Sequence, residues 1–118
     1  RQLQTRVLTQ VRALLAPGQR FIFSVWQFQR SPKLMARVQP WSALPQLDAN
    51  DLEPGDTLLD WRCSVPGQPE QSGLRYVHLF TPERLASLTA ETGFALVESF
   101  DSDGHTGNLS SYQICKAV

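Results

Sequence analysis

The sequence opens with a helix that leads into an apolar strand, and this order constrains the fold more than any other feature. Between Leu3 and Leu15, apolar residues recur every three or four positions, which is typical of one buried helix face. Pro17-Gly18 ends the helix, because proline cannot continue the hydrogen-bond ladder and glycine accepts the turn. Arg20 to Trp26 is apolar on both sides, which predicts a central strand covered on two faces. A helix and strand with no strand before them indicate the later part of an α/β domain.

Composition and charge exclude few classes of function. The 118 residues suit one small domain, and 42% hydrophobic residues can build a core. The formal net charge of +0 gives no overall attraction to a polyanion, and the helix face with Arg1, Arg6 and Arg12 is either solvated or a local RNA footprint. No apolar run approaches the roughly 20 residues that span a bilayer, so we expect a cytoplasmic protein without a membrane partner. Cys63 and Cys115 lack CxxC spacing, which favours two buried or half-buried thiols over a disulfide.

The middle of the chain is less regular than its ends. Residues 27–73 carry six of the eight prolines, which predicts an irregular insertion or lid on the substrate side. Regular structure is expected to return with a strand at Arg75 to Phe80 and a helix that Thr81 caps. A strand from Phe94 to Phe100 and a close return at Ser110 to Lys116 then predict an antiparallel final hairpin.

Several of these segments resemble the C-terminal half of a class I S-adenosylmethionine-dependent methyltransferase. Leu15-Ala-Pro-Gly-Gln-Arg-Phe-Ile-Phe-Ser-Val-Trp26 resembles that superfamily's turn into its fifth strand, with Gln19 where a second glycine is usual. Thr81 to Phe100 and Ser110 to Lys116 resemble its last helix and its sixth and seventh strands. The resemblance implies an α/β fold: half of a Rossmann-like sheet, with parallel strands, an antiparallel final hairpin and the insertion.

The same resemblance has consequences for the cofactor. It implies that residues 1–118 are the C-terminal part of one methyltransferase domain whose cofactor-binding N-terminal half is absent. S-adenosyl-L-methionine would then be bound mainly by the missing half, and the fragment alone would be inactive. A fragment that exposes the edge of a split sheet is also expected to associate with itself.

Three further segments narrow the resemblance. The strand end Val25-Trp26, Gly55-Asp-Thr-Leu-Leu-Asp-Trp-Arg62 and Arg75-Tyr-Val-His-Leu-Phe80 together resemble the tRNA methyltransferases that esterify a carboxymethyl group on the wobble uridine. This implies a tRNA acceptor. The ending Asp101 to Tyr112 departs from the tyrosine-rich ending of the eukaryotic members. A small-molecule methyl acceptor and a non-catalytic interaction module are the alternatives.

Methyl transfer needs alignment and shielding more than acid–base chemistry, so we expect substrate-positioning side chains. No catalytic residue is assigned, and no spacing of metal ligands is present. Arg62 is the first choice for an anionic substrate group, because a guanidinium grips a carboxylate or phosphate with two hydrogen bonds. Its alternative role is a salt bridge to Asp60 that holds the insertion, and Arg75 has the same two interpretations.

Aromatic residues complete the predicted site. Tyr76 and His78 share a strand face, where they either contact a base or pack beneath the final helix. Trp26, at the C-terminal end of its strand, either lines a ligand pocket or fills the core, and Trp61 either supports the substrate or packs inside the insertion. The predicted substrate-binding set is Trp26, Asp60, Trp61, Arg62, Arg75, Tyr76 and His78.

Overall fold

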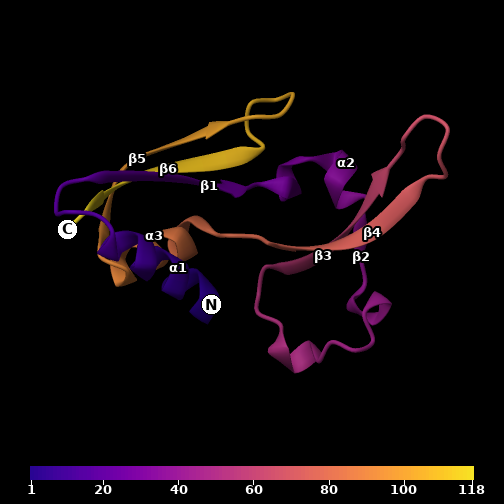
Figure 1. The fold of residues 1–118 in the computed structure, drawn as a ribbon, viewed down its shortest axis with the longest axis horizontal. Helices are drawn as coiled ribbons and strands as arrows, with labels where there is room; N and C mark the ends of the chain where they lie inside the picture. The colour runs from indigo at the N-terminus through magenta and orange to yellow at the C-terminus, as the bar shows by residue number, and fades with distance from the viewer. The chain divides into compact units, whose positions relative to one another are not determined.

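The computed structural model describes residues 1–118, which form two compact units (Figure 1). The terminal unit consists of Arg1–Gln27 and Phe80–Val118, and the hairpin unit consists of Phe28–Leu79. Each unit has its own three-stranded sheet.

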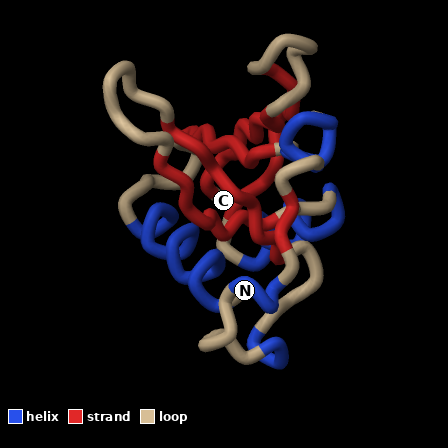
Figure 2. The backbone as a smooth tube through the Cα atoms, turned by 90° about the vertical axis from the view of Figure 1, so that its right-hand side faces the viewer, coloured by secondary structure: helices blue, strands red, loops and turns tan.

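The sheet of the terminal unit has the order β1-β6-β5, and every neighbouring pair is antiparallel. In register, Phe23 of β1 lies opposite Gln113 of β6, and Phe94 of β5 lies opposite Ala117 of β6. Two helices lie along one side of this sheet (Figure 2, helices in blue). The elements are α1 (Gln2–Ala13), β1 (Arg20–Trp26), α3 (Pro82–Glu91), β5 (Phe94–Ser102) and β6 (Ser110–Ala117).

This topology corrects the predicted fold. We expected parallel strands in a Rossmann-like sheet, but the structure contains two antiparallel sheets and no parallel pair. The reason is that β6 lies between β1 and β5, so these two strands, which run in the same direction, never pair. The prediction that β1 is a central strand is also wrong. It is an edge strand, and Ile22 on its far face is 56% exposed because the helices cover only one side.

The core of the terminal unit lies between the two helices and the sheet. It contains Leu8 of α1, Leu88 of α3 and, from the sheet, Phe94, Cys115 and Ala117. The predicted start of α3 is confirmed, because the Thr81 hydroxyl accepts a hydrogen bond from the Arg84 N–H at 3.1 Å and Pro82 follows it. Neither α1 nor α3 has the length and apolar character that crossing a membrane would require.

The hairpin unit is built on a long antiparallel pair, β3 (Asp56–Cys63) and β4 (Gln71–His78), with a short strand β2 (Val38–Gln39) beside β3. Leu58 and Leu59 are 1% and 2% exposed although they point to opposite faces, so both faces are covered at this level of the sheet. The predicted irregular insertion therefore contains an ordered sheet. The remaining elements are α2 (Pro32–Met35) and three short 3₁₀ helices, η1 (Phe28–Arg30), η2 (Trp41–Ala43) and η3 (Ala49–Asp51).

Candidate functional site

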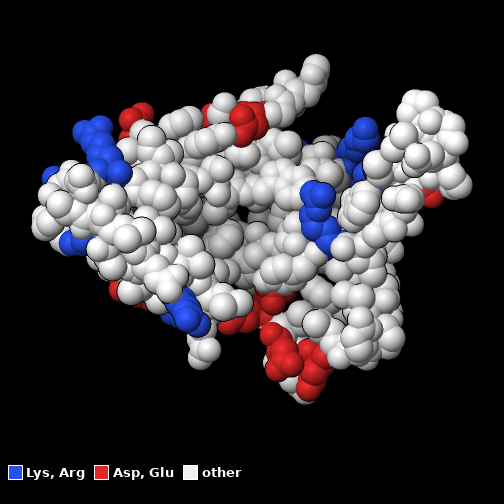
Figure 3. All heavy atoms as spheres, in the orientation of Figure 1, with Lys and Arg blue, Asp and Glu red and all other residues white.

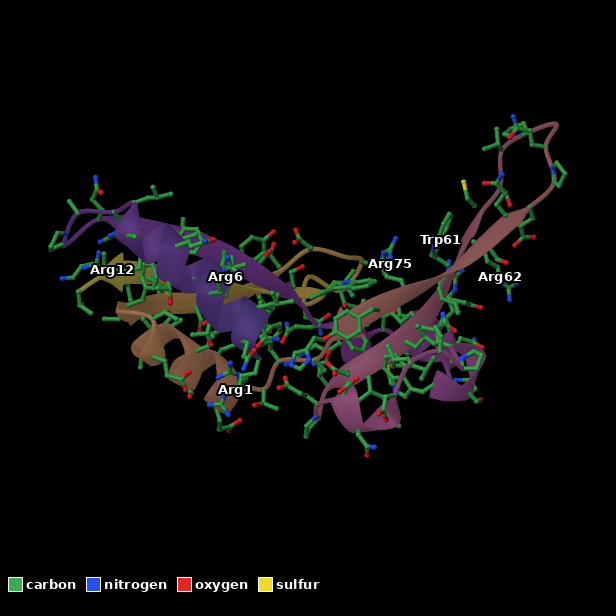
Figure 4. The ribbon with its side chains drawn as sticks, turned by 60° about the horizontal axis from the view of Figure 1, so that its bottom comes forward. Arg1, Arg6, Arg12, Trp61, Arg62 and Arg75 are labelled. Carbon is green, nitrogen blue, oxygen red and sulfur yellow. The ribbon has the colours of Figure 1, made fainter.

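The register of β3 against β4 separates the predicted site residues onto two faces of one hairpin. Asp60 lies opposite Leu74, Arg62 opposite Ser72, and Trp61 opposite Gly73. Directly opposed residues share a face, and successive residues of a strand alternate between faces. Figure 4 shows Trp61 and Arg75 on one side of the hairpin and Arg62 on the other. We call these the Arg62 face, with Asp60, Arg62, Tyr76 and His78, and the Trp61 face, with Trp61 and Arg75.

Trp26 does not belong to this hairpin. It is the last residue of β1 in the terminal unit, where it lies opposite Ser110 and is half-buried. The structure thus groups four of the seven predicted residues on one face, and two on the opposite face of the same hairpin.

A compact hydrogen-bonded cluster occupies one end of the Arg62 face. Asp56 Oδ1 lies 2.6 Å from the Tyr76 hydroxyl and 2.7 Å from His78 Nδ1, and Asp56 Oδ2 accepts a hydrogen bond from the Glu53 N–H at 2.7 Å. Because the carboxylate only accepts, the His78 proton that faces it sits on Nδ1. The cluster fixes the orientation of the imidazole and of the phenol together.

These contacts shift the ionisation of the cluster. Burial alone would raise the pKa of Asp56, but the hydrogen bonds from Glu53, Tyr76 and His78 outweigh it, so that the pKa lies below its ordinary 3.8. Burial and the neighbouring carboxylate raise the pKa of Tyr76 to about 12. Asp56 therefore stays an anion, and Tyr76 stays a neutral donor, across the physiological range.

Asp56 is the site residue that the sequence analysis missed. It lies opposite His78, 22 positions away in the chain. The signal that could have found it is Pro66-Gly67, a turn dipeptide midway between the two strands, since a hairpin centred there pairs these positions.

A groove of about 540 Å³ lies further along the Arg62 face. Arg62 is placed between two carboxylates, with its Nη2 3.7 Å from Asp60 Oδ2 and its Nε 4.0 Å from Glu70 Oε1. The predicted Asp60–Arg62 pair is therefore present, at a long distance. Asp60 Oδ1 is buried and has no hydrogen-bond partner. The groove is lined by Gln39, Asp60, Arg62, Glu70, Ser72, Gly73 and Leu74.

On the Trp61 face, the indole packs directly against the opposite strand. A Cβ added to Gly73 would lie 2.6 Å from Trp61 Nε1 and 2.9 Å from its Cε2. The absence of a side chain at Gly73 is what lets the ring approach the backbone. Trp61 is thus part of the hairpin's own packing, and Arg75 on this face is exposed.

Arg1, which precedes α1, and Arg12 within it have structural partners, whereas Arg6 is exposed. Arg12 donates hydrogen bonds from Nε to the Gly93 carbonyl at 3.0 Å, from Nη1 to that of Leu15 at 2.9 Å and from Nη2 to that of Val118 at 2.6 Å. Arg1 pairs with Glu91 at 3.2 Å. Acidic and basic side chains are interspersed on the visible face, without a continuous basic stripe (Figure 3).

Other chemistry-bearing groups are dispersed. No three His, Cys, Asp or Glu side chains lie close enough together to hold a metal ion. Both cysteines are free thiols, as predicted, but only Cys115 is buried; the prediction that both would be buried or half-buried is wrong for Cys63, which is exposed. A second groove of about 370 Å³, in the terminal unit, is mainly apolar, and Leu3 and Val7 at its rim are exposed. The predicted self-association has apolar surface available there.

Comparison with solved structures links this architecture to a methyltransferase. The chain is similar to the CcbJ methyltransferase from Streptomyces caelestis, with a TM-score of 0.57 and 16% sequence identity. The similarity covers 97% of this chain and 52% of that protein, so the chain spans about half its length. No protein-family model matches, and no curated protein matches. The likeness concerns the fold alone, and nothing in it supports the narrower resemblance to the wobble-uridine enzymes.

Proposed function

We propose that this chain is the substrate-side part of an S-adenosylmethionine-dependent methyltransferase. The observation that carries the proposal is the fold likeness to a solved methyltransferase along 97% of the chain, which includes both the terminal and the hairpin units. The segments that resemble the late strands of a methyltransferase in sequence, β1, β5 and β6, are the strands of the terminal sheet.

The proposal places the cofactor outside residues 1–118. A nucleotide-type cofactor is commonly held by a glycine-rich turn between a strand and a helix, where backbone N–H groups approach it closely. The helix that follows β4, α3, begins at Thr81-Pro82 and has no glycine in the preceding turn. The residues present do not fit the cofactor, so this chain's contribution is to bind and orient the methyl acceptor.

We place the acceptor on the Arg62 face. Its groove of about 540 Å³ falls in the size range of small-molecule sites, roughly 300 to 1,000 Å³. Asp56 holds Tyr76 and His78 in fixed orientations at the other end of that face. A small molecule is the acceptor that this geometry favours. A tRNA acceptor remains the prediction from sequence resemblance. It is not favoured by Arg1 and Arg12, because their guanidinium groups already contact Glu91 and the Gly93 carbonyl.

Calorimetry tests where the cofactor binds. Titration of S-adenosylmethionine into the 118-residue chain should give no binding in the micromolar range. Micromolar affinity would contradict the assignment of the cofactor to another part of the protein.

A methyl-transfer assay tests the activity. The protein as encoded in its genome is incubated with radiolabelled S-adenosylmethionine and either a small-molecule extract or total tRNA. Label in the small-molecule fraction is the expected result. Arg62→Ala should lower transfer, whereas Arg75→Ala, on the opposite face, serves as the matched control. Label in tRNA alone would show that the acceptor is tRNA and not a small molecule. Label in neither fraction would refute the proposal that the protein is a methyltransferase.

A further inference from the structure

The two edges of the terminal sheet differ in how they are protected. Edge strands are commonly shielded by a β-bulge or by charged side chains, because their unpaired backbone groups otherwise recruit another strand. β5 has both devices, since its register shifts between Leu96 and Glu98 and it carries the exposed carboxylates of Glu98 and Asp101. β1 pairs with β6 without a shift, and its only charge is Arg20 at the first position. β1 is therefore the edge that is open to another strand.

The backbone of β1 presents hydrogen-bonding groups at this edge. Gln19 and Gln27, which flank β1, make backbone hydrogen bonds of 2.8 Å and 2.7 Å to the residues directly opposite them, at the two ends of β6. Opposed residues of an antiparallel pair alternate between hydrogen-bonded and non-bonded positions, so the odd-numbered residues of β1 bond β6. The N–H and C=O groups of Ile22 and Ser24 therefore point away from β6, toward the open edge.

Apolar side chains lie on both sides of the same edge. On the helix side, Phe23 and Val25 border the groove of about 370 Å³, and Leu3 and Val7 of α1 at its rim are 74% and 56% exposed. On the opposite side of the sheet, Ile22 is 56% exposed. An added strand would bury these side chains and pair the backbone groups in one step.

β1 is complementary to itself in the antiparallel direction. Placing Ile22 opposite Ser24 of the partner subunit pairs every residue of β1, and each such pair can exchange two N–H···O bonds. The same register puts Phe23 opposite the partner's Phe23 on the helix side, beside the apolar groove. This arrangement has two-fold symmetry, so both copies use the same surface and neither keeps an open β1 edge. The formal net charge of +0 adds no overall repulsion between copies.

We infer that β1 is a dimerisation edge, at which two copies of this chain join their three-stranded sheets through antiparallel β1–β1 pairing. The side chains of Leu3, Val7 and Phe23 are then covered on the helix side. The inference goes beyond the proposed function and gives the predicted self-association a defined interface. One strand pair and one apolar strip form a small interface, so we expect a Kd of about 10 μM.

Measurements on the unaltered chain test the inference directly. Sedimentation velocity should show a monomer at about 1 μM and a dimer at about 1 mM, below and above the expected Kd. Hydrogen–deuterium exchange, read by mass spectrometry with fragmentation that resolves single amides, is compared at the same two concentrations. The amides of Ile22 and Ser24 should exchange about tenfold more slowly in the dimer. The Phe23 amide, which bonds β6, should be protected at both concentrations.

Variants distinguish this edge from other surfaces. Ser24→Pro removes an outward N–H and leaves the bonds to β6 intact, so it should weaken dimerisation about tenfold or more. Ile22→Lys places a charge at the edge and should do the same. Leu96→Lys is the matched control, because it changes an apolar residue of the other edge strand that is similarly exposed, at 49%, and it should leave the Kd within about twofold.

Four results would each overturn the inference. They are a monomer at about 1 mM, a dimer whose Ile22 and Ser24 amides are unprotected, a dimer indifferent to Ile22→Lys and Ser24→Pro, and a dimer weakened equally by Leu96→Lys. Protection of both amides in the monomer would overturn it as well, since it would show that another segment of the same chain covers the edge.

Discussion

The anchoring of α1 by Arg12 gives the sharpest prediction about stability. The guanidinium bonds three carbonyls that come from separate places, the end of α1, the turn before β5 and the end of the chain. Arg12→Ala removes all three hydrogen bonds at once. A hydrogen bond to a charged group contributes about 1.5 to 3 kcal/mol, but these carbonyls are partly exposed and regain water in the variant. We therefore expect a total loss of about 3 kcal/mol, not the sum of three full bonds.

Urea denaturation followed by circular dichroism measures this loss. With a slope of about 2 kcal/mol per molar urea, the midpoint should fall by about 1.5 M. Arg12→Lys keeps the charge, but a single ammonium cannot span the three acceptors, so it should restore less than half of the loss. Arg6→Ala, on the exposed side of the same helix, is the control and should shift stability by less than about 0.5 kcal/mol. Equal midpoints for Arg12→Ala and Arg6→Ala would refute the reasoning.

Three further results are expected. Gly73→Ala should destabilise the folded chain by about 1 to 3 kcal/mol and shift the tryptophan fluorescence, because the new Cβ would overlap Trp61. In thermal denaturation, the double variant with Trp61→Leu should recover part of this lost stability. Since the folded pKa of Asp56 is lowered, its stabilisation is present above its ordinary value of 3.8 and is lost as pH falls through the folded value. Acid titration between about pH 5 and 2 should therefore cost the wild type more stability than Asp56→Asn, and equal acid sensitivity would contradict this. Alkylation of the native chain, read by mass spectrometry, should label Cys63 alone, because burial protects Cys115 and raises the pKa of its thiol.

Local chemistry was predictable from sequence wherever the interacting groups are near in the chain. The helix cap at Thr81 and Pro82 could be predicted from residue type and spacing, and the Thr81 hydroxyl accepts a hydrogen bond from the N–H of Arg84, three residues later. The alternation that separates Arg75 from Tyr76 and His78 follows from the two-residue period of a strand, and the observed register agrees with it.

Long-range partners were not predictable in the same way. Helical periodicity places Arg12 on a polar face, and its acceptors at Gly93 and Val118 lie 81 and 106 residues away. The prediction of the strand arrangement in the sheet failed for a related reason. Apolar residues on both sides of β1 indicate burial on both faces, but the pattern cannot reveal that β6 pairs between β1 and β5, or that Ile22 stays exposed.

The string Asp60-Trp61-Arg62 shows how this limit affects a site. In sequence, the three residues look like one recognition element, with an aromatic ring beside an ion pair. In an extended strand the middle residue points away from its neighbours, and here the indole is also pressed against Gly73 of the opposite strand. Trp61 therefore cannot stack on a ligand that occupies the groove beside Arg62. What the strand does place beside that groove is Arg62, and two carboxylates flank it there, Asp60 of the same strand and Glu70 of the loop that leads into β4.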